Sequence, residues 1–105
     1  MGNSSRTKAA RLGEKLLRIR LELGLSQNGM LERLGFGEEL FRSNVSQYEL
    51  GTRVPPLPVL LEYARAAGVY VDDLIDDEFD LPDKIPGAVR HEGIRRNAGA
   101  LGKKR

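Results

Sequence analysis

Apolar side chains recur every three or four residues in the first part of the chain, with polar residues between them. The first such run places four apolar residues on one helical face: Leu12, Leu16, Ile19 and Leu23. This spacing is typical of an amphipathic helix that buries one face. Gly24 follows the run, and glycine is the residue that most often ends a helix. The pattern therefore predicts a helix over about residues 9–23.

Four shorter helices are predicted by the same reasoning. Ser26 is a favoured N-cap residue, and the helix that it begins is expected to end at Gly35. A proline suits the first turn of a helix, so Pro58 marks the start of another. Gly51 and Gly68 mark two further ends. The expected ranges are about 27–34, 43–50, 58–67 and 71–75.

No convincing alternation of apolar and polar residues indicates a strand, so the predicted fold is all-α. We expect a five-helix domain over residues 9–76, a flexible N-terminal arm over 1–8, and an acidic-then-basic tail over 77–105 that is largely disordered after about residue 88. The predicted core is Leu16, Ile19, Leu31, Val45, Leu60, Leu61, Ala64 and Leu74. The tail holds four apolar residues that could dock onto the domain: Leu81, Ile85, Val89 and Ile94.

Charge is distributed unevenly along the chain. Residues 1–20 carry six Lys or Arg and one Glu, whereas residues 55–80 carry one Arg and seven Asp or Glu. Residues 81–105 carry seven Lys or Arg and two acids. Two basic ends therefore bracket an acidic segment. Basic ends favour a polyanionic partner such as nucleic acid, because binding releases its counterions.

Several classes of protein do not fit the composition. The chain has no cysteine, so the fold cannot rest on disulfides, and it has neither an apolar run of about 18 residues nor a signal peptide. We therefore expect a soluble, intracellular protein. His91 is the only histidine and has no nucleophile paired with it, and the acids of residues 72–80 lack the spacing of a calcium loop. The sequence thus predicts no enzyme, no cofactor and no metal.

Two segments resemble a known family. The sequence SNVSQYELGTRVPPLPVLLEYARAAGVYVDDLI over residues 43–75 resembles the second half of a Cro/repressor-type helix-turn-helix domain of the XRE family. The sequence LGLSQ over residues 23–27 is similar to that family's junction of helices one and two. The resemblance implies a λ-repressor-like fold and a sequence-specific transcriptional regulator, in most cases a homodimeric repressor that places helix three in the major groove. It also implies a cytoplasmic, nucleoid-associated protein of a prokaryote or phage.

The resemblance assigns roles to particular positions. Base reading falls to residues on the third helix: Arg42, Ser43, Asn44 and Gln47. Contacts to DNA phosphates fall to residues on both sides of that helix: Gln27, Thr52 and Arg53. A structural ion pair between Arg20 and Glu49 would aim the third helix. Arg and Gln suit base reading because each presents two hydrogen-bonding atoms in one plane.

The chain departs from the family between helices two and three. From Ser26 to Glu49 it is about four residues longer than the family's usual spacing, and the extra residues fall within 36–41. One alternative is an additional turn on the third helix, since Phe41, Val45 and Tyr48 would share a face. The other is a loop that carries Glu38 and Glu39 away from DNA. The placement of Arg42 and Ser43 depends on which is correct.

Two other functions stay open on the sequence. The chain could be the antitoxin of a toxin–antitoxin pair, in which the DNA-binding domain represses its own operon and the C-terminal tail holds the toxin. It could also be a protein-interaction module that keeps the fold without binding DNA, as the acidic insertion and the acidic segment after the fourth helix suggest. The expected partners are double-stranded DNA, a second copy of the chain and a protein bound by the tail, with no membrane.

Overall fold

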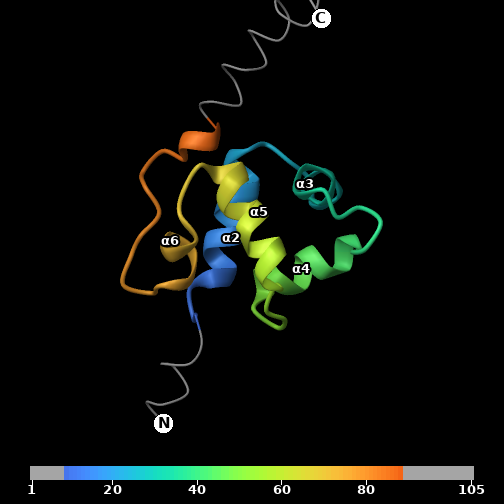
Figure 1. Ribbon diagram of the computed structural model, residues 1–105, viewed down its shortest axis with the longest axis horizontal. Coiled ribbons are helices and arrows are strands. Elements are labelled where there is room, and N and C mark those ends of the chain that lie inside the picture. The colour runs from blue at the N-terminus through green and yellow to red at the C-terminus, as the bar shows by residue number, and fades with distance from the viewer. Residues whose placement is uncertain (1–8, 89–105) are drawn as a thin grey trace, which may run out of the picture.

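The computed structural model describes residues 9–88, and these residues contain helices but no strand (Figure 1). The helices are α2 (Leu12–Glu22), α3 (Gln27–Leu34), α4 (Arg42–Leu50), α5 (Leu57–Ala67) and α6 (Val71–Ile75). The predicted all-α fold is therefore confirmed. The arm over residues 1–8 and the part of the tail after residue 88, with His91, Val89 and Ile94, lie outside the described residues.

Local signals in the sequence account for the helix ends. The Oγ atom of Ser26 accepts a hydrogen bond from the backbone N–H of Gly29 at 2.9 Å, which caps the start of α3. At the end of α4, Gly51 adopts a left-handed φ of 82°, which a residue with a Cβ atom tolerates poorly. The chain thereby turns sharply out of α4 towards α5.

The core forms around α2 and α5, which lie side by side in the middle of the molecule (Figure 1). Seven of the eight predicted core residues are buried: Leu16, Ile19, Leu31, Val45, Leu60, Ala64 and Leu74. The prediction for Leu61 is wrong, because 40% of that residue is exposed. Successive residues on a helix point about 100° apart, so Leu61 lies outside the face of α5 that Leu60, Ala64 and Tyr63 turn inward.

Residues 76–88, here called the C-terminal strap, continue across α2 after α6 and end in a short helical turn over residues 86–88 (Figure 1). Leu81 and Ile85 are buried members of the core. A Cβ atom on Gly87 would lie 1.9 Å from the carbonyl oxygen of Ala66, so only glycine fits where the strap meets the end of α5. The packed body thus extends beyond residue 76, where the sequence analysis ends the domain. The division of the chain into arm, domain and tail stays a prediction.

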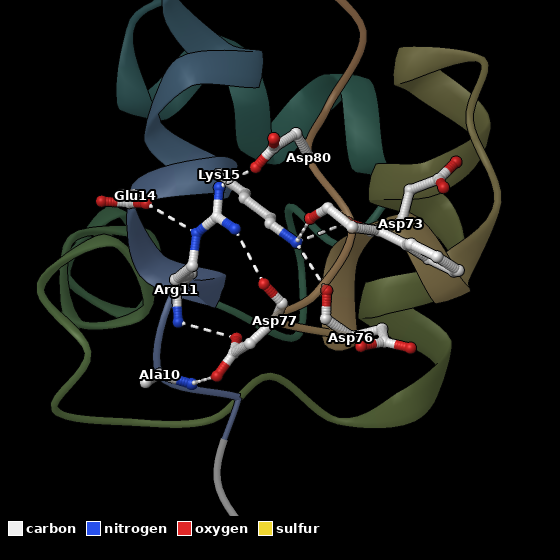
Figure 2. A network of polar contacts seen from close by, with 9 residues as sticks. Ala10, Arg11, Glu14, Lys15, Asp73, Asp76, Asp77 and Asp80 are labelled. Carbon is white, nitrogen blue, oxygen red and sulfur yellow. Dashed lines mark hydrogen bonds and ion pairs between the residues drawn. The ribbon is translucent and has the colours of Figure 1, made fainter. Parts of the chain in front are cut away.

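Cationic side chains of α2 and the residue before it hold the strap in place (Figure 2). Lys15 is only 3% exposed, and its Nζ atom donates to the carbonyl oxygens of Asp73 at 2.7 Å, Asp76 at 3.0 Å and Phe79 at 2.7 Å. Burial lowers the pKa of Lys15 below its ordinary value. Lys15 therefore satisfies three backbone acceptors at the point where α6 ends and the strap begins.

Further hydrogen bonds join the strap to the residues just before α2, and they involve both the backbone and the side chains of Asp77 and Arg11. The carboxylate of Asp77 accepts hydrogen bonds from the backbone N–H groups of Ala10 at 2.9 Å and Arg11 at 3.0 Å, just before α2 begins. The Arg11 guanidinium donates to the Asp77 carbonyl oxygen at 2.8 Å and to the Asp80 carboxylate at 2.5 Å. Further along α2, Arg18 donates to the carbonyl oxygens of Pro82 and Asp83. The strap is thus tied to α2 along most of its length.

Within residues 9–88, every helix is too short or too polar to cross a lipid bilayer.

Candidate nucleic-acid interface

The inserted residues between α3 and α4 form a loop and not an additional helical turn. The backbone N–H of Leu40 donates to the carbonyl oxygen of Phe36 at 2.9 Å, and both side chains pack against the core. α4 begins only at Arg42. Glu38 and Glu39 are exposed on this loop, which bulges outward beside α4 in Figure 1. The additional turn on the third helix is therefore wrong, and the inserted residues form a loop.

α4 buries one side and exposes the other. Val45 and Tyr48 are buried, whereas Arg42 and Ser43 are exposed and Gln47 is partly exposed. Residues 43 and 47 lie one turn apart, so their side chains share a helical face. The predicted base-reading residues Arg42, Ser43 and Gln47 therefore stand where a ligand outside the domain can reach them.

Asn44, the fourth predicted base-reading residue, has a structural contact. Its Oδ1 atom accepts a hydrogen bond from the backbone N–H of Phe41 at 2.8 Å. The residue at the N-cap, Phe41, has no side-chain acceptor, so Asn44 supplies the capping contact from within the first turn. A bidentate contact with adenine would need that same amide oxygen. The sequence analysis missed this role, although a phenylalanine before the helix and an asparagine three residues later are both visible in the sequence.

Arg20 and Glu49 form a bidentate ion pair between α2 and the end of α4. The distances are 2.6 Å from Nε to Oε2 and 3.1 Å from Nη2 to Oε1, with side chains only 14% and 6% exposed. The Arg20 Nη1 atom also donates to the carbonyl oxygen of Leu25 at 3.0 Å. The hydrogen bond that Arg20 donates to Glu49 raises the pKa of Arg20, against the opposing effect of burial. These are the two residues that the sequence analysis pairs.

Gln27 joins the same network at the start of α3. Its Nε2 atom donates to Glu49 Oε1 at 3.3 Å, so one carboxylate orients both Gln27 and Arg20. The first backbone hydrogen bond into α3 runs from Met30 to Ser26 at 2.8 Å. The N–H groups of Gln27 and Asn28 precede that bond, and helix N-termini of this kind favour anions. The network thus connects the start of α3 to the end of α4.

Close packing also positions the end of α4. A Cβ atom on Gly13 would lie 2.6 Å from the carbonyl oxygen of Glu49, so α2 and α4 approach more closely than any other residue would allow. Beyond α4, the Thr52 backbone N–H donates to the carbonyl oxygen of Gln47 at 3.0 Å, and its hydroxyl lies 3.4 Å from the same atom. Arg53 follows and is exposed. Gln27 and the pair Thr52–Arg53 therefore all lie next to the C-terminal end of α4, the element that carries the predicted base readers.

Comparison with known protein families places residues 11–77 in a family described as a helix-turn-helix domain. Neither a curated protein nor a solved structure matches the chain significantly. The match covers more than half of the 105 residues and contains α2 to α6 together with the loop between α3 and α4. The resemblance seen in the sequence is thereby confirmed. This chain belongs to the helix-turn-helix family, in agreement with a DNA-binding protein of the XRE type.

Proposed function

We propose that this protein is a sequence-specific transcriptional regulator, acting as a repressor and binding DNA as a homodimer through α4 in the major groove. The observation that supports it most is the exposed side of α4, with Arg42, Ser43 and Gln47, on a helix whose orientation the partly buried Arg20–Glu49 pair restrains. A preoriented helix loses less entropy on binding than a mobile one. That the chain is not an enzyme stays a prediction, which agrees with the family.

The side chains on α4 match the chemistry of base edges. Arg42 suits the N7 and O6 acceptors of guanine, and Gln47 suits adenine, which offers a donor and an acceptor. Asn44 acts in this proposal chiefly by holding the start of α4 in place, because its amide oxygen is bonded to Phe41. Gln27 and Arg53, both near the C-terminal end of α4, bind phosphates and set the register of the helix on the duplex.

A dimer follows from the size of the contact. One recognition helix reads a single half-site, and proteins of this architecture gain specificity from two half-sites about one helical turn apart. We therefore expect two protomers on each duplex selected from a random pool, and a selected sequence with approximate twofold symmetry. The stoichiometry can be measured by mass from light scattering of the complex. One protomer on an asymmetric site would contradict the dimer.

The first prediction separates base reading from phosphate binding. Gln47→Ala should weaken binding to the selected duplex by about 1–3 kcal/mol and relax the preference at one base position. Arg53→Ala should weaken binding to all duplexes alike and lower the salt slope by about one unit. Binding of both variants to selected and scrambled duplexes, measured over a range of salt concentrations, provides the test.

Lys84→Ala is the control for loss of a positive charge. Lys84 is exposed on the C-terminal strap, which lies across the molecule from α4 in Figure 1, so its removal should leave the salt slope unchanged. If Gln47→Ala and Arg53→Ala both bind like the wild type, α4 is not the DNA-reading element. If the wild type has no salt-dependent affinity for any duplex, a protein-interaction module replaces the regulator.

A further inference from the structure

Phe41 is a large exposed side chain next to the predicted base readers, and the sequence predicts for it only a possible place beside Val45 and Tyr48 on one helical face. Phe41 is 74% exposed and immediately precedes Arg42 at the start of α4. It is absent from the apolar side chains that pack against the core, whereas its neighbour Leu40 is among them. A large aromatic ring thus projects into solvent next to the surface proposed to read DNA.

The structure holds this ring outward by two contacts on either side of it. The Leu40 side chain packs on the core, and its N–H bonds to Phe36 at 2.9 Å, so the loop is anchored one residue before Phe41. On the other side, the Asn44 Oδ1 atom accepts the Phe41 N–H at 2.8 Å. The Phe41 backbone is extended, with φ −116° and ψ 162°. This backbone directs the Phe41 side chain into solvent, away from the core on which Leu40 packs.

The chemistry of the ring limits what it can recognise in a duplex. Phenylalanine has no hydrogen-bonding atom, and the apolar group that B-DNA presents at its major-groove base edges is the C5 methyl of thymine. A phosphate contact is disfavoured at this end of α4, because Glu38 and Glu39 are exposed on the preceding loop. Insertion of apolar side chains between base steps is chiefly a minor-groove device.

We propose that Phe41 is a specificity-determining residue that packs its ring against the C5 methyl group of a thymine in each half-site. This inference rests on the proposed function, because it requires α4 in the major groove. Asn44 then has a second role. Because it holds the Phe41 backbone, it positions the ring that contacts the methyl group.

The test removes one methyl group from the DNA and one ring from the protein. In a duplex selected by the full-length wild type, each thymine is replaced singly by deoxyuridine, which lacks only the methyl. Within each half-site, the replacement of one particular thymine should weaken wild-type binding about three- to fivefold, which is the effect of one buried methyl group. 5-Bromodeoxyuridine at that position should restore it, because bromine has nearly the volume of a methyl group.

Phe41→Ala should bind the thymine duplex more weakly than the wild type and should no longer distinguish thymine from deoxyuridine. Loss of the ring and loss of the methyl group are then not additive, as expected for groups in contact. Phe79→Ala is the matched control, because Phe79 is a phenylalanine 48% exposed on the strap, across the molecule from α4 (Figure 1). It should keep both the affinity and the discrimination.

Three outcomes overturn the inference. If the wild type binds its selected duplex but no single deoxyuridine weakens binding, Phe41 reads no methyl group, while the proposed function stands. If Phe41→Ala keeps the full preference for thymine over deoxyuridine, Phe41 again reads no methyl group and the proposed function again stands. If the wild type binds no duplex, both proposals fail together. Circular dichroism and thermal unfolding of Phe41→Ala check that the fold is kept, as expected for an exposed side chain.

Discussion

At the residue scale, two adjacent leucines in α5 should differ in how much each contributes to the free energy of unfolding. Leu60 is buried beside the core, whereas Leu61 is 40% exposed. Leu60→Ala should therefore lower the free energy of unfolding by about 2–5 kcal/mol, through lost burial and the cavity that remains. Leu61→Ala removes the same atoms and should lower it by about 1 kcal/mol or less. Urea unfolding of the two variants makes the comparison, and equal losses would contradict the assigned orientation of α5.

Lys15 is a charged residue that acts as a core residue. Lys15→Met keeps most of the buried aliphatic stem but leaves the carbonyl oxygens of Asp73, Asp76 and Phe79 without their donor. Because hydrogen bonds to charged groups are worth about 1.5–3 kcal/mol each and are not additive, we expect a loss of about 2–4 kcal/mol in the free energy of unfolding.

Lys84→Met is the matched control for Lys15→Met, since Lys84 is exposed. Its free energy of unfolding should stay within about 0.5 kcal/mol of the wild type. Denaturant unfolding measures both variants. A Lys15→Met protein as stable as Lys84→Met would mean that the lysine does not hold the strap.

At the scale of elements, the orientation of α4 depends on a partly buried ion pair that links it to α2. Arg20→Met or Glu49→Leu alone leaves a charge without its partner and should lower the free energy of unfolding by about 3–5 kcal/mol. The double variant should lose clearly less than the sum, because it removes both charges. Unfolding of the four proteins forms the double-mutant cycle. Additive losses would show that the pair contributes no coupling.

The same cycle bears on the candidate interface. Glu49 accepts from both Arg20 and Gln27, so its loss should also release the Gln27 side chain at the start of α3. The glycine contact between α2 and α4 remains in these variants. We therefore expect α4 to stay in place but to reorient more freely, which would weaken binding to a selected duplex.

At the scale of the whole molecule, the C-terminal strap joins the end of the described chain to its beginning. Hydrogen bonds from Arg11 and Ala10 hold the pKa of Asp77 below its ordinary value of 3.8, so the folded protein favours the charged carboxylate. The stability that this carboxylate contributes is present above that ordinary value. It is lost as the pH falls through the lower pKa of the folded state.

Asp77→Asn should therefore make the free energy of unfolding less sensitive to acid below about pH 4 than it is in the wild type. Asp80 has a pKa lowered by its hydrogen bond to Arg11, and Asp80→Asn should act in the same direction. Urea unfolding at a series of pH values between about 5 and 2 gives the pH dependence of the free energy of unfolding for the wild type and both variants. A wild type and an Asp77→Asn protein with parallel profiles would place the acid-sensitive contacts elsewhere.

The sequence alone determined the class of the fold and the approximate ends of its helices. Helical periodicity and glycine stops act within a few residues, so the predicted ranges for α3 and α6 match the structure, and the other helices begin or end within a few residues of it. The family pattern added the pairing of Arg20 with Glu49, which are 29 residues apart and which no local rule would have joined.

Only the tertiary structure decided which side chains meet. Leu61 faces outward because α2, α3 and α6 pack on the other sides of α5, and an apolar run of several residues cannot turn every member inward. Lys15 is buried because residues 58 to 64 positions further along the chain supply its acceptors. The loop before α4 exposes Phe41 because its neighbour Leu40 is the residue that packs against the core. Contacts of this range depend on how helices pack together, and periodicity along the chain carries no information about that.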